Sequence, residues 1–242
     1  MTETSFTQIW VYLSATPLLG LSITLLAYIA GMHLYLRSGS NPLVNPVAIA
    51  IVLIIIYLFI SNTSFDVYFD GAQFVHFLLG PATVALAVPL YLQIAKLKAI
   101  WIPLMISVLI GSATAALSSV GIAWMLSASP QTILSMAPKS MTTPIAMGVS
   151  EQLGGLPSLT AVLVISTGII GAVMGTRLFH LMRIEDDSVK GVAMGLNSHG
   201  IGTARAFQVS PEMGAFSGLG MALMAFSGPV LIPWLLSIFG LV

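Results

Sequence analysis

The chain has no cysteine, and only 7% of its 242 residues are charged. The lack of cysteine excludes disulfides and metal or iron–sulfur sites built from thiolates. Eight basic residues balance eight acidic ones, which argues against a nucleic-acid partner. The four histidines are too far apart for a local metal motif, and no Walker, dinucleotide-binding or Gly-x-Ser-x-Gly motif occurs. We therefore expect no enzyme activity and no bound cofactor or metal.

Apolar residues are abundant instead, at 57% of the chain with a mean hydropathy of +1.00. This composition is typical of an integral membrane protein. We expect an all-α, polytopic fold of about 5–8 membrane helices or half-helices in a single domain, 1–242. Residues 1–8 have no basic residue, so we read no secretory signal there. The expected spans are 10–36, 47–60, 99–127, 159–182 and 214–241, with 62–71, which holds Asp66 and Asp70, as a solvated loop.

Three segments interrupt the apolar pattern beyond the two N-terminal spans of residues 1–62. Residues 72–93 contain Pro81 and Pro89, 136–159 contain three prolines and a Gly-Gly pair, and 191–208 are rich in glycine and polar residues. Such backbone is tolerated at bilayer depth only where protein or a cavity surrounds it. We expect broken or re-entrant elements here; the alternative for 136–159 is an ordinary loop outside the membrane.

The interruptions recur at a fixed spacing. Thr83, Thr143 and Thr203 are equally spaced along the chain. We call the number of residues from one threonine to the next the repeat interval. Gly111 and Gly171, in the following spans, are one repeat interval apart. The pattern suggests that 72–242 consists of units, each a broken element followed by a span, and such inverted repeats are common in transporters. If Lys and Arg mark the cytoplasmic side, segment 136–159 must enter the membrane and return to the side from which it came. Segment 72–93 would instead cross the membrane.

Two isolated cations, Lys139 and Arg205, lie among small or apolar residues in two of the interruptions. A cation at membrane depth is costly and usually marks a pathway or a partner. Helix N-termini at the breaks would also favour an anion. Alternatively, Lys139 pairs with Glu151, or both side chains reach the interface. The expected substrate-binding residues are Lys139, Ser140, Thr142, Thr143, Asn197, Ser198, His199, Thr203 and Arg205.

Glu151 and His199 are the candidates for proton coupling, because His199 could titrate near neutral pH. The alternative for His199 is a neutral residue that hydrogen-bonds and packs two helices. Two pairs of glycines, Gly171 with Gly175 and Gly214 with Gly218, would allow close helix contact. They predict a homo-oligomer, or else they pack inside one protomer.

Four stretches carry a resemblance to a known family. PKSMTTPIA at 138–146 resembles the PKSVTTPIA signature of the LrgB/CidB family. SHGIGTAR at 198–205, PATVALAVPLY at 81–91 and GGLP at 154–157 are similar to further signatures of that family. Met141 replaces the usual valine, and Asn197 precedes the Ser-His pair. The resemblance covers residue 45 to the C-terminus.

The resemblance implies a multi-pass protein of the bacterial inner membrane, in contact with the lipid bilayer. Such proteins are often encoded beside a smaller LrgA/CidA-like membrane partner, and this chain leaves open whether it needs one. Related proteins carry glycolate and glycerate in plastids, and bacterial pairs are linked to pyruvate uptake. We expect a carrier of small 2-hydroxy or 2-oxo monocarboxylates (glycolate, glycerate, lactate or pyruvate type), with proton coupling as a hypothesis. The alternative is a holin-like or antiholin-like regulator of murein hydrolase export and cell lysis.

Overall fold

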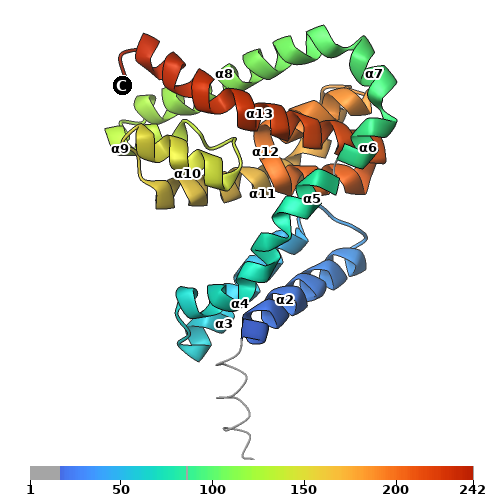
Figure 1. Cartoon of the computed structure of the whole chain (residues 1–242), viewed down its shortest axis with the longest axis vertical. Helices are drawn as coiled ribbons and strands as arrows, with labels where there is room; N and C mark the ends of the chain where they lie inside the picture. The colour runs from blue at the N-terminus through green and yellow to red at the C-terminus, as the bar shows by residue number, and fades with distance from the viewer. Residues whose placement is uncertain (1–16, 86, 242) are drawn as a thin grey trace, which may run out of the picture. The chain divides into compact units, whose positions relative to one another are not determined.

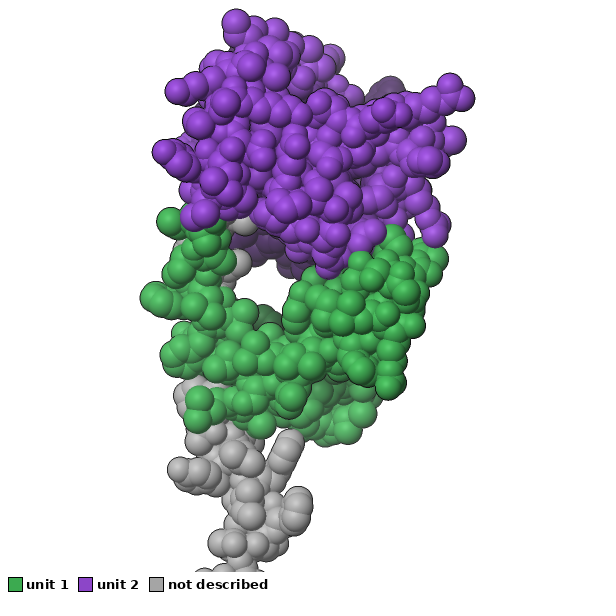
Figure 2. All heavy atoms as spheres, turned by 90° about the vertical axis from the view of Figure 1, so that its right-hand side faces the viewer, with its two compact units in different colours: residues 1–85 green, residues 86–242 purple. Residues whose placement is uncertain are grey.

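The computed structural model describes residues 17–85 and 87–241, which are helical or in turns and contain no strand. Its contacts divide the chain into two compact units, residues 1–85 and 86–242, which are coloured green and purple in Figure 2. Four helices, α2, α8, α11 and α13, are long and apolar enough to cross a membrane. The chain is therefore an all-α polytopic membrane protein, as the composition predicted.

The described part of unit 1, residues 17–85, contains the helices α2 (Pro17–Arg37), α3 (Pro46–Ser61), α4 (Phe65–Phe77) and α5 (Leu79–Ala85). Gly20 and Gly31 let α2 approach the backbone of α4 and α3 closely. The expectation of a loop at 62–71 is wrong, because Asp66 and Asp70 lie within α4. Asp66 lies in the first turn of α4, a position that suits a carboxylate, so the acidic residues did not by themselves mark a loop. Of the first expected span, residues 10–16 lie outside the described residues.

The interrupted segment 72–93 is a run of short helices. After α5, α6 (Ala87–Leu92) and α7 (Ile94–Ala99) follow in unit 2. Pro81 and Pro89 each occupy the third position of their helices, α5 and α6. Proline is tolerated in a first turn, where its missing N–H would be unsatisfied anyway. The prolines therefore begin new helices rather than kink one long helix.

The rest of unit 2 alternates full spans with broken elements. The spans are α8 (Trp101–Met125), α11 (Pro157–Leu181) and α13 (Pro211–Ile238), close to the predicted 99–127, 159–182 and 214–241. Pro229 and Pro233 lie inside α13 without ending it. The broken elements are α9 (Pro130–Met136) with α10 (Thr143–Gln152), and α12 (Asp187–Val209).

Helices α9 and α10 form a hairpin that enters and leaves at the same end of the spans. The Ser135 hydroxyl, near the end of α9, accepts a hydrogen bond from Leu156 N at 2.7 Å, just before α11. Thr160 Oγ1 donates to Ser135 O at 3.0 Å. Both helices lie at the end of unit 2 where α13 finishes (Figure 1). The expected return of 136–159 to its own side agrees with this arrangement.

Helix α12 is a second hairpin with two helical arms. Its backbone leaves the helical conformation at His199, with φ 40° and ψ −132°. Ser210 Oγ, just beyond the second arm, donates to Asp187 Oδ2 at 2.6 Å at the start of the first arm. The two arms therefore begin and end together. This base follows the far end of α11, whose 25 residues measure about 37 Å. The two hairpins thus enter from opposite ends of α11.

Equivalent contacts relate the two hairpins. A methyl group in place of the Gly168 hydrogen on α11 would lie 3.0 Å from Ile201 Cδ1 in the second hairpin. A methyl group at Gly228 on α13 would lie 2.9 Å from Met141 Cε in the first hairpin. Gly228 follows Gly168 by one repeat interval, and Ile201 follows Met141 by the same interval. Each span thus packs against the hairpin of the other repeat through equivalent residues. A two-fold relation between inverted repeats produces this exchange of contacts.

Candidate functional site

The bend of the first hairpin, residues 137–142, presents one cation. Lys139 N donates to Met136 O at 3.3 Å and Met141 N donates to Pro138 O at 3.0 Å, which fold the bend into successive turns. Lys139 is half-buried, and Nζ donates to the Ser140 hydroxyl at 3.3 Å. Met141 beside it is fully buried.

No carboxylate of the described residues neutralises Lys139. In that part of the chain, ion pairs join Lys96 to Asp186 and Glu212, and Lys190 to Asp187. The alternative pairing of Lys139 with Glu151 is therefore not formed. An unpaired cation of this kind is a functional-site candidate with an anion as its natural partner.

The N-terminus of α10 adds to the positive character of this bend. Thr142 occupies the N-cap position but makes no side-chain capping bond. The first N–H groups of a helix lack partners within the helix and carry partial positive charge. Thr142 and Thr143 are half-buried, and Ser140 is buried. An anion at Lys139 would therefore meet further donors here.

His199 forms the bend of the second hairpin. Its Nε2 lies 2.9 Å from Val164 O on α11, and the residue is 5% exposed. A methyl group at Gly168 would lie 2.7 Å from Cε1 of the imidazole, so only glycine leaves room for the ring. Ser198 packs over Gly171 of the same helix in the same way. The glycines of α11 therefore create the space that the second bend occupies.

Thr203 supports this bend. Its hydroxyl donates to the carbonyl of His199 at 2.8 Å, and it lies 2.9 Å from Ser217 Oγ on α13. A hydroxyl has one hydrogen, so Ser217 is the donor in the second contact. The hydroxyl proton of Thr203 is thereby committed inside the protein, and its expected contact with substrate stays a prediction.

The repeat relates the two bends. His199 follows Lys139 by one repeat interval, so the two occupy equivalent positions of the repeat. The structure thus places Lys139 and Ser140 on the first bend and His199 on the second, with Ser198 and Thr203 beside His199.

Three other expected site residues are not part of the two bends. Glu151 is exposed in the last turn of α10, at the opposite end of that helix from the bend. Arg205 Nη1 donates to Gln208 Oε1 at 3.0 Å within the second arm of α12. Asn197 Nδ2 donates to Ala193 O at 3.0 Å and borders a groove of about 370 Å³ between α8 and α12. Their roles in substrate binding or proton coupling stay predictions.

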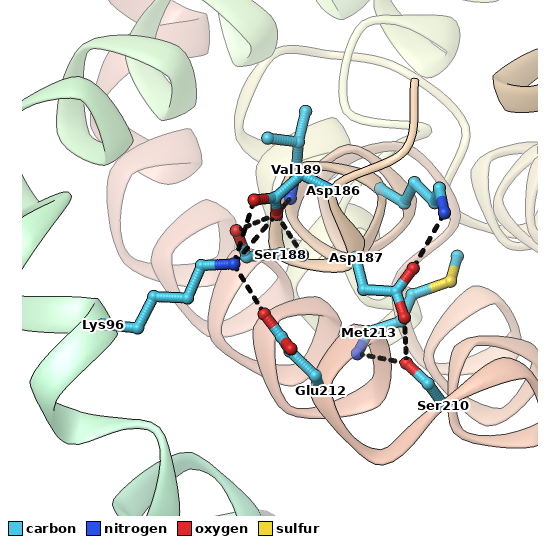
Figure 3. A network of polar contacts seen from close by, with 9 residues as sticks. Lys96, Asp186, Asp187, Ser188, Val189, Ser210, Glu212 and Met213 are labelled. Atoms are coloured by element: carbon cyan, nitrogen blue, oxygen red, sulfur yellow. Dashed lines mark hydrogen bonds and ion pairs between the residues drawn. The ribbon is translucent and has the colours of Figure 1, made fainter. Parts of the chain in front are cut away.

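The base of the second hairpin carries a charged network (Figure 3). Lys96 Nζ donates to Glu212 Oε1 at 2.7 Å and to Asp186 Oδ2 at 3.0 Å. The bond to Glu212 raises the pKa of Lys96, whereas the Ser188 hydroxyl and then Lys96 lower the pKa of Asp186.

Asp187 is the other acid of this base. It accepts hydrogen bonds from Lys190 Nζ at 2.8 Å and from Ser210 Oγ at 2.6 Å, which lower its pKa. Asp186, at the N-cap, and Asp187, in the first turn, suit the N-terminus of α12.

The glycine pairs that predicted an oligomer pack inside the protomer. Gly171 and Gly175 face Ser198 and Met194 of α12, and Gly214 faces Phe207. These contacts occupy the close-approach surfaces of α11 and the start of α13. Their proposed role as an oligomer interface is wrong for these three glycines, and homo-oligomerisation itself stays a prediction.

Sequence reasoning missed Gly168, Gly228 and Ser217, which hold the two bends in place. The signal was present in the repeat interval, which joins Gly168 to Gly228 and Lys139 to His199. The described residues bring no three His, Asp or Glu side chains together as metal ligands.

Comparison with known proteins places this architecture in context. Residues 24–238 match the LrgB-like family. The chain is 35% identical to the uncharacterized protein YwbG of Bacillus subtilis over 220 residues, 91% of this chain and 97% of the relative. It is 30% identical to the antiholin-like protein LrgB of Bacillus cereus over 225 residues, 93% of this chain and 98% of the relative. A protein of the same name from Bacillus anthracis matches equally well. No solved structure matches.

Proposed function

Because this chain belongs to the LrgB-like family, we propose that it is a carrier of small 2-hydroxy or 2-oxo monocarboxylates in the bacterial inner membrane. One observation carries the proposal: two hairpins enter from opposite ends of α11, and their bends carry Lys139 and His199 at equivalent positions of the repeat. Broken helices that meet between inverted repeats are typical of transporter substrate sites. The carrier performs no chemical conversion.

Lys139 binds the carboxylate in this proposal. The Ser140 hydroxyl and the uncapped N-terminus of α10 add neutral donors on the same bend. A single cation balances a single carboxylate, so a monocarboxylate leaves the site neutral. A dicarboxylate would leave one negative charge without a partner in a poorly solvated site, which is unfavourable.

An antiholin-like regulator of murein hydrolase export is the second candidate, because relatives at 30% identity bear the name antiholin-like protein LrgB. That function needs no site for a small anion. Homo-oligomers and a smaller LrgA/CidA-like partner fit either candidate and are part of neither test below.

Binding and uptake by the purified chain separate the two candidates. We expect saturable binding of radiolabelled lactate, glycolate or pyruvate in detergent, and uptake into proteoliposomes above empty liposomes. Binding is measured as well because it does not depend on a partner protein. Lys139→Met should weaken binding by about ten- to a hundred-fold, since hydrogen bonds to charged groups contribute about 1.5–3 kcal/mol.

The matched control is Lys98→Met, which removes the same charge from an exposed position on α7 and should leave binding unchanged. Equal binding by wild type and Lys139→Met would remove Lys139 from the site. Absence of binding for all three acids, together with leakage of larger solutes from the proteoliposomes, would favour the lytic candidate.

A further inference from the structure

A groove of about 370 Å³ separates the first arm of α12 from α7 and α8. On α12 it extends from Ser188 to Asn197, which is about 13 Å at the helical rise of about 1.5 Å per residue. Ser188 belongs to the charged base of the second hairpin, and Asn197 lies just before the bend at His199. The groove therefore joins the base of this hairpin to its bend.

The inner end of the groove lies at membrane depth. Gly111 lines it, near the middle of the 25-residue span α8. A methyl group in place of the Gly111 hydrogen would lie 3.2 Å from Leu196 Cδ1 on α12, so the two walls meet at this level. The length of the groove is close to half the hydrocarbon thickness of a bilayer, which is about 15 Å. Asn197, next to Leu196, is therefore held well below the membrane surface.

Two exposed polar side chains line the groove at this depth. Asn197 Nδ2 donates to Ala193 O at 3.0 Å. A primary amide has two N–H groups and a carbonyl oxygen, so one donor and the acceptor of Asn197 stay available. Ser107 lies on the opposite wall, one helical turn before Gly111. Exposed polar groups are costly against hydrocarbon, and at membrane depth they mark a path for water or a polar solute.

The outer end of the groove is bridged by an ion pair. Lys96 Nζ on α7 reaches across to Asp186 Oδ2 at 3.0 Å, at the start of α12, and also bonds Glu212 Oε1 at 2.7 Å (Figure 3). All three side chains are partly exposed, so the pairs contribute little free energy and can open at low cost. Lys96 is then free to meet an incoming anion.

The floor between the two ends is apolar. Leu104, Val192 and Leu196 line the groove and are buried. They offer no charge that would hold a carboxylate, and a conduction path requires binding that is weak enough for the solute to leave.

We infer that this groove is the route along which the small acid passes between the membrane surface and the bends, with Lys96 as its first contact and Ser107 and Asn197 as polar contacts further in. The inference rests on the proposed function and adds a path and its residues to it. Lys96, Lys98, Arg183 and Lys190 gather at the outer end, which makes this the cytoplasmic end by the positive-inside rule.

Single-cysteine variants test the route, because the chain has no cysteine of its own. Ser107→Cys and Asn197→Cys in proteoliposomes are treated with a charged, membrane-impermeant methanethiosulfonate, which reacts with the thiolate and so needs water at the thiol. The matched control is Ile106→Cys, at an exposed position of α8 that does not line the groove. We expect both groove thiols to react at least about ten-fold faster than the control thiol in lipid. Ser107→Cys is nearly isosteric, so the test survives if Asn197→Cys does not fold.

Sidedness and protection complete the test. Lys98→Cys, exposed on α7, marks the outer end. We expect reagent added from the side that labels Lys98→Cys, and only from that side, to label the groove thiols. Lactate should slow labelling of Asn197→Cys several-fold and leave Lys98→Cys unchanged, whereas the neutral amide of lactate should protect neither.

The outcomes separate this inference from the proposed function. If wild type binds the acids but the groove thiols react as slowly as Ile106→Cys, lipid or another helix fills the groove, so the route is wrong and the carrier stands. Labelling from the opposite side, or fast labelling that lactate does not slow although wild type binds it, would also overturn the route alone. Absence of binding by wild type would overturn the carrier, and the route for acids with it.

Discussion

The two re-entrant hairpins of unit 2 share a backbone plan but place their charges at opposite ends. The first has a base of hydroxyls, where Thr160 joins Ser135 and Ser150, and a cation at its bend. The second has a charged base around Asp187 and an imidazole at its bend. The two hairpins therefore share a backbone geometry, but their side chains differ. The positive charge lies at the bend of the first hairpin, whereas the charged groups of the second lie at its base.

Ser150 and Ser210 illustrate the difference, because they are one repeat interval apart and both close the base of a hairpin. Ser150 Oγ lies 2.7 Å from Thr160 Oγ1, and Ser210 donates to Asp187 at 2.6 Å. One base is neutral at every physiological pH and the other depends on ionised groups. In the proposed carrier, the charge of Lys139 on the first bend would give a bound acid one preferred orientation.

The largest expected effect is a difference in stability between alanine substitutions at Gly168 and Gly228, which occupy equivalent positions in the two repeats. Gly168→Ala would press a methyl group to 2.7 Å from Cε1 of the rigid His199 ring, whereas Gly228→Ala meets the flexible end of Met141. Overpacking costs about 1–3 kcal/mol, and we expect the upper end at Gly168 and less than about 1 kcal/mol at Gly228. Thermal unfolding in detergent measures both.

Gly121→Ala on α8 is the control, because nothing lies within 4 Å of the added methyl group. The helix propensity gained from alanine, about 0.5–1 kcal/mol, is common to all three variants, so the packing difference is what remains. Equal melting temperatures for Gly168→Ala and Gly228→Ala would show that the second bend is no more rigid than the first.

The sequence predicted the architecture better than it predicted the partners of individual residues. The spans and the interruptions follow from hydropathy and proline, and α8, α11 and α13 lie close to their predicted ranges. The expected loop at 62–71 was wrong because an acidic residue such as Asp66, in the first turn of α4, suits a helix N-terminus as well as a loop. The glycine pairs failed because close approach looks the same in sequence within and between protomers.

The sequence identified part of the candidate site. Lys139 and His199 were each identified from residue type and neighbours, and Ser140 followed from its place beside Lys139. The place of His199 on the second bend depends on the return of α12 there, where the backbone has φ 40°. No propensity rule places a histidine in that conformation, since tertiary contacts to Val164 and Gly168 hold it there. Residues one repeat interval apart occupy equivalent positions, so comparing the repeats would have related Lys139 to His199.

The second prediction, of intermediate size, concerns how the stability of each hairpin base depends on pH. Thr160→Val removes a buried hydroxyl that bonds Ser135 O and Ser150, and should cost about 2 kcal/mol at pH 7 and at pH 3 alike. Ser210→Ala should cost about 1 kcal/mol at pH 7 and less at pH 3. Asp187 has a pKa below its ordinary 3.8, so its contribution is full above 3.8 and is lost as pH falls through the folded value.

Chemical unfolding at the two pH values measures both costs. A Thr160→Val penalty that shrinks with the Ser210→Ala penalty would mean that the first base also senses an ionised group. A Ser210→Ala penalty that stays constant would mean that Asp187 keeps its charge throughout this range or does not need Ser210.

The smallest expected effect concerns Lys96, which ties Asp186 and Glu212 together at the charged base. Its side chain is 34% exposed and those of Asp186 and Glu212 are 49% and 32% exposed, so water screens the pairs. Lys96→Met should therefore destabilise the chain by only about 0.5 kcal/mol, and the loss should vanish in about 1 M salt. The pKa of Lys96 lies above its ordinary 10.5, so the contribution is full below 10.5 and is lost as pH rises through the folded value.

Lys98→Met on the same helix is the matched control, because Lys98 is exposed. Unfolding of both variants at low and high salt, at pH 7 and above pH 10.5, gives the comparison. A loss for Lys96→Met that survives high salt would mean that the short-range contact of the Lys96 ammonium with the Phe216 ring, rather than its ion pairs, holds this base together. The charged hairpin would then rely on the same kind of short-range contact as the neutral one, and the difference between the two would reduce to Lys139 and His199 at their bends.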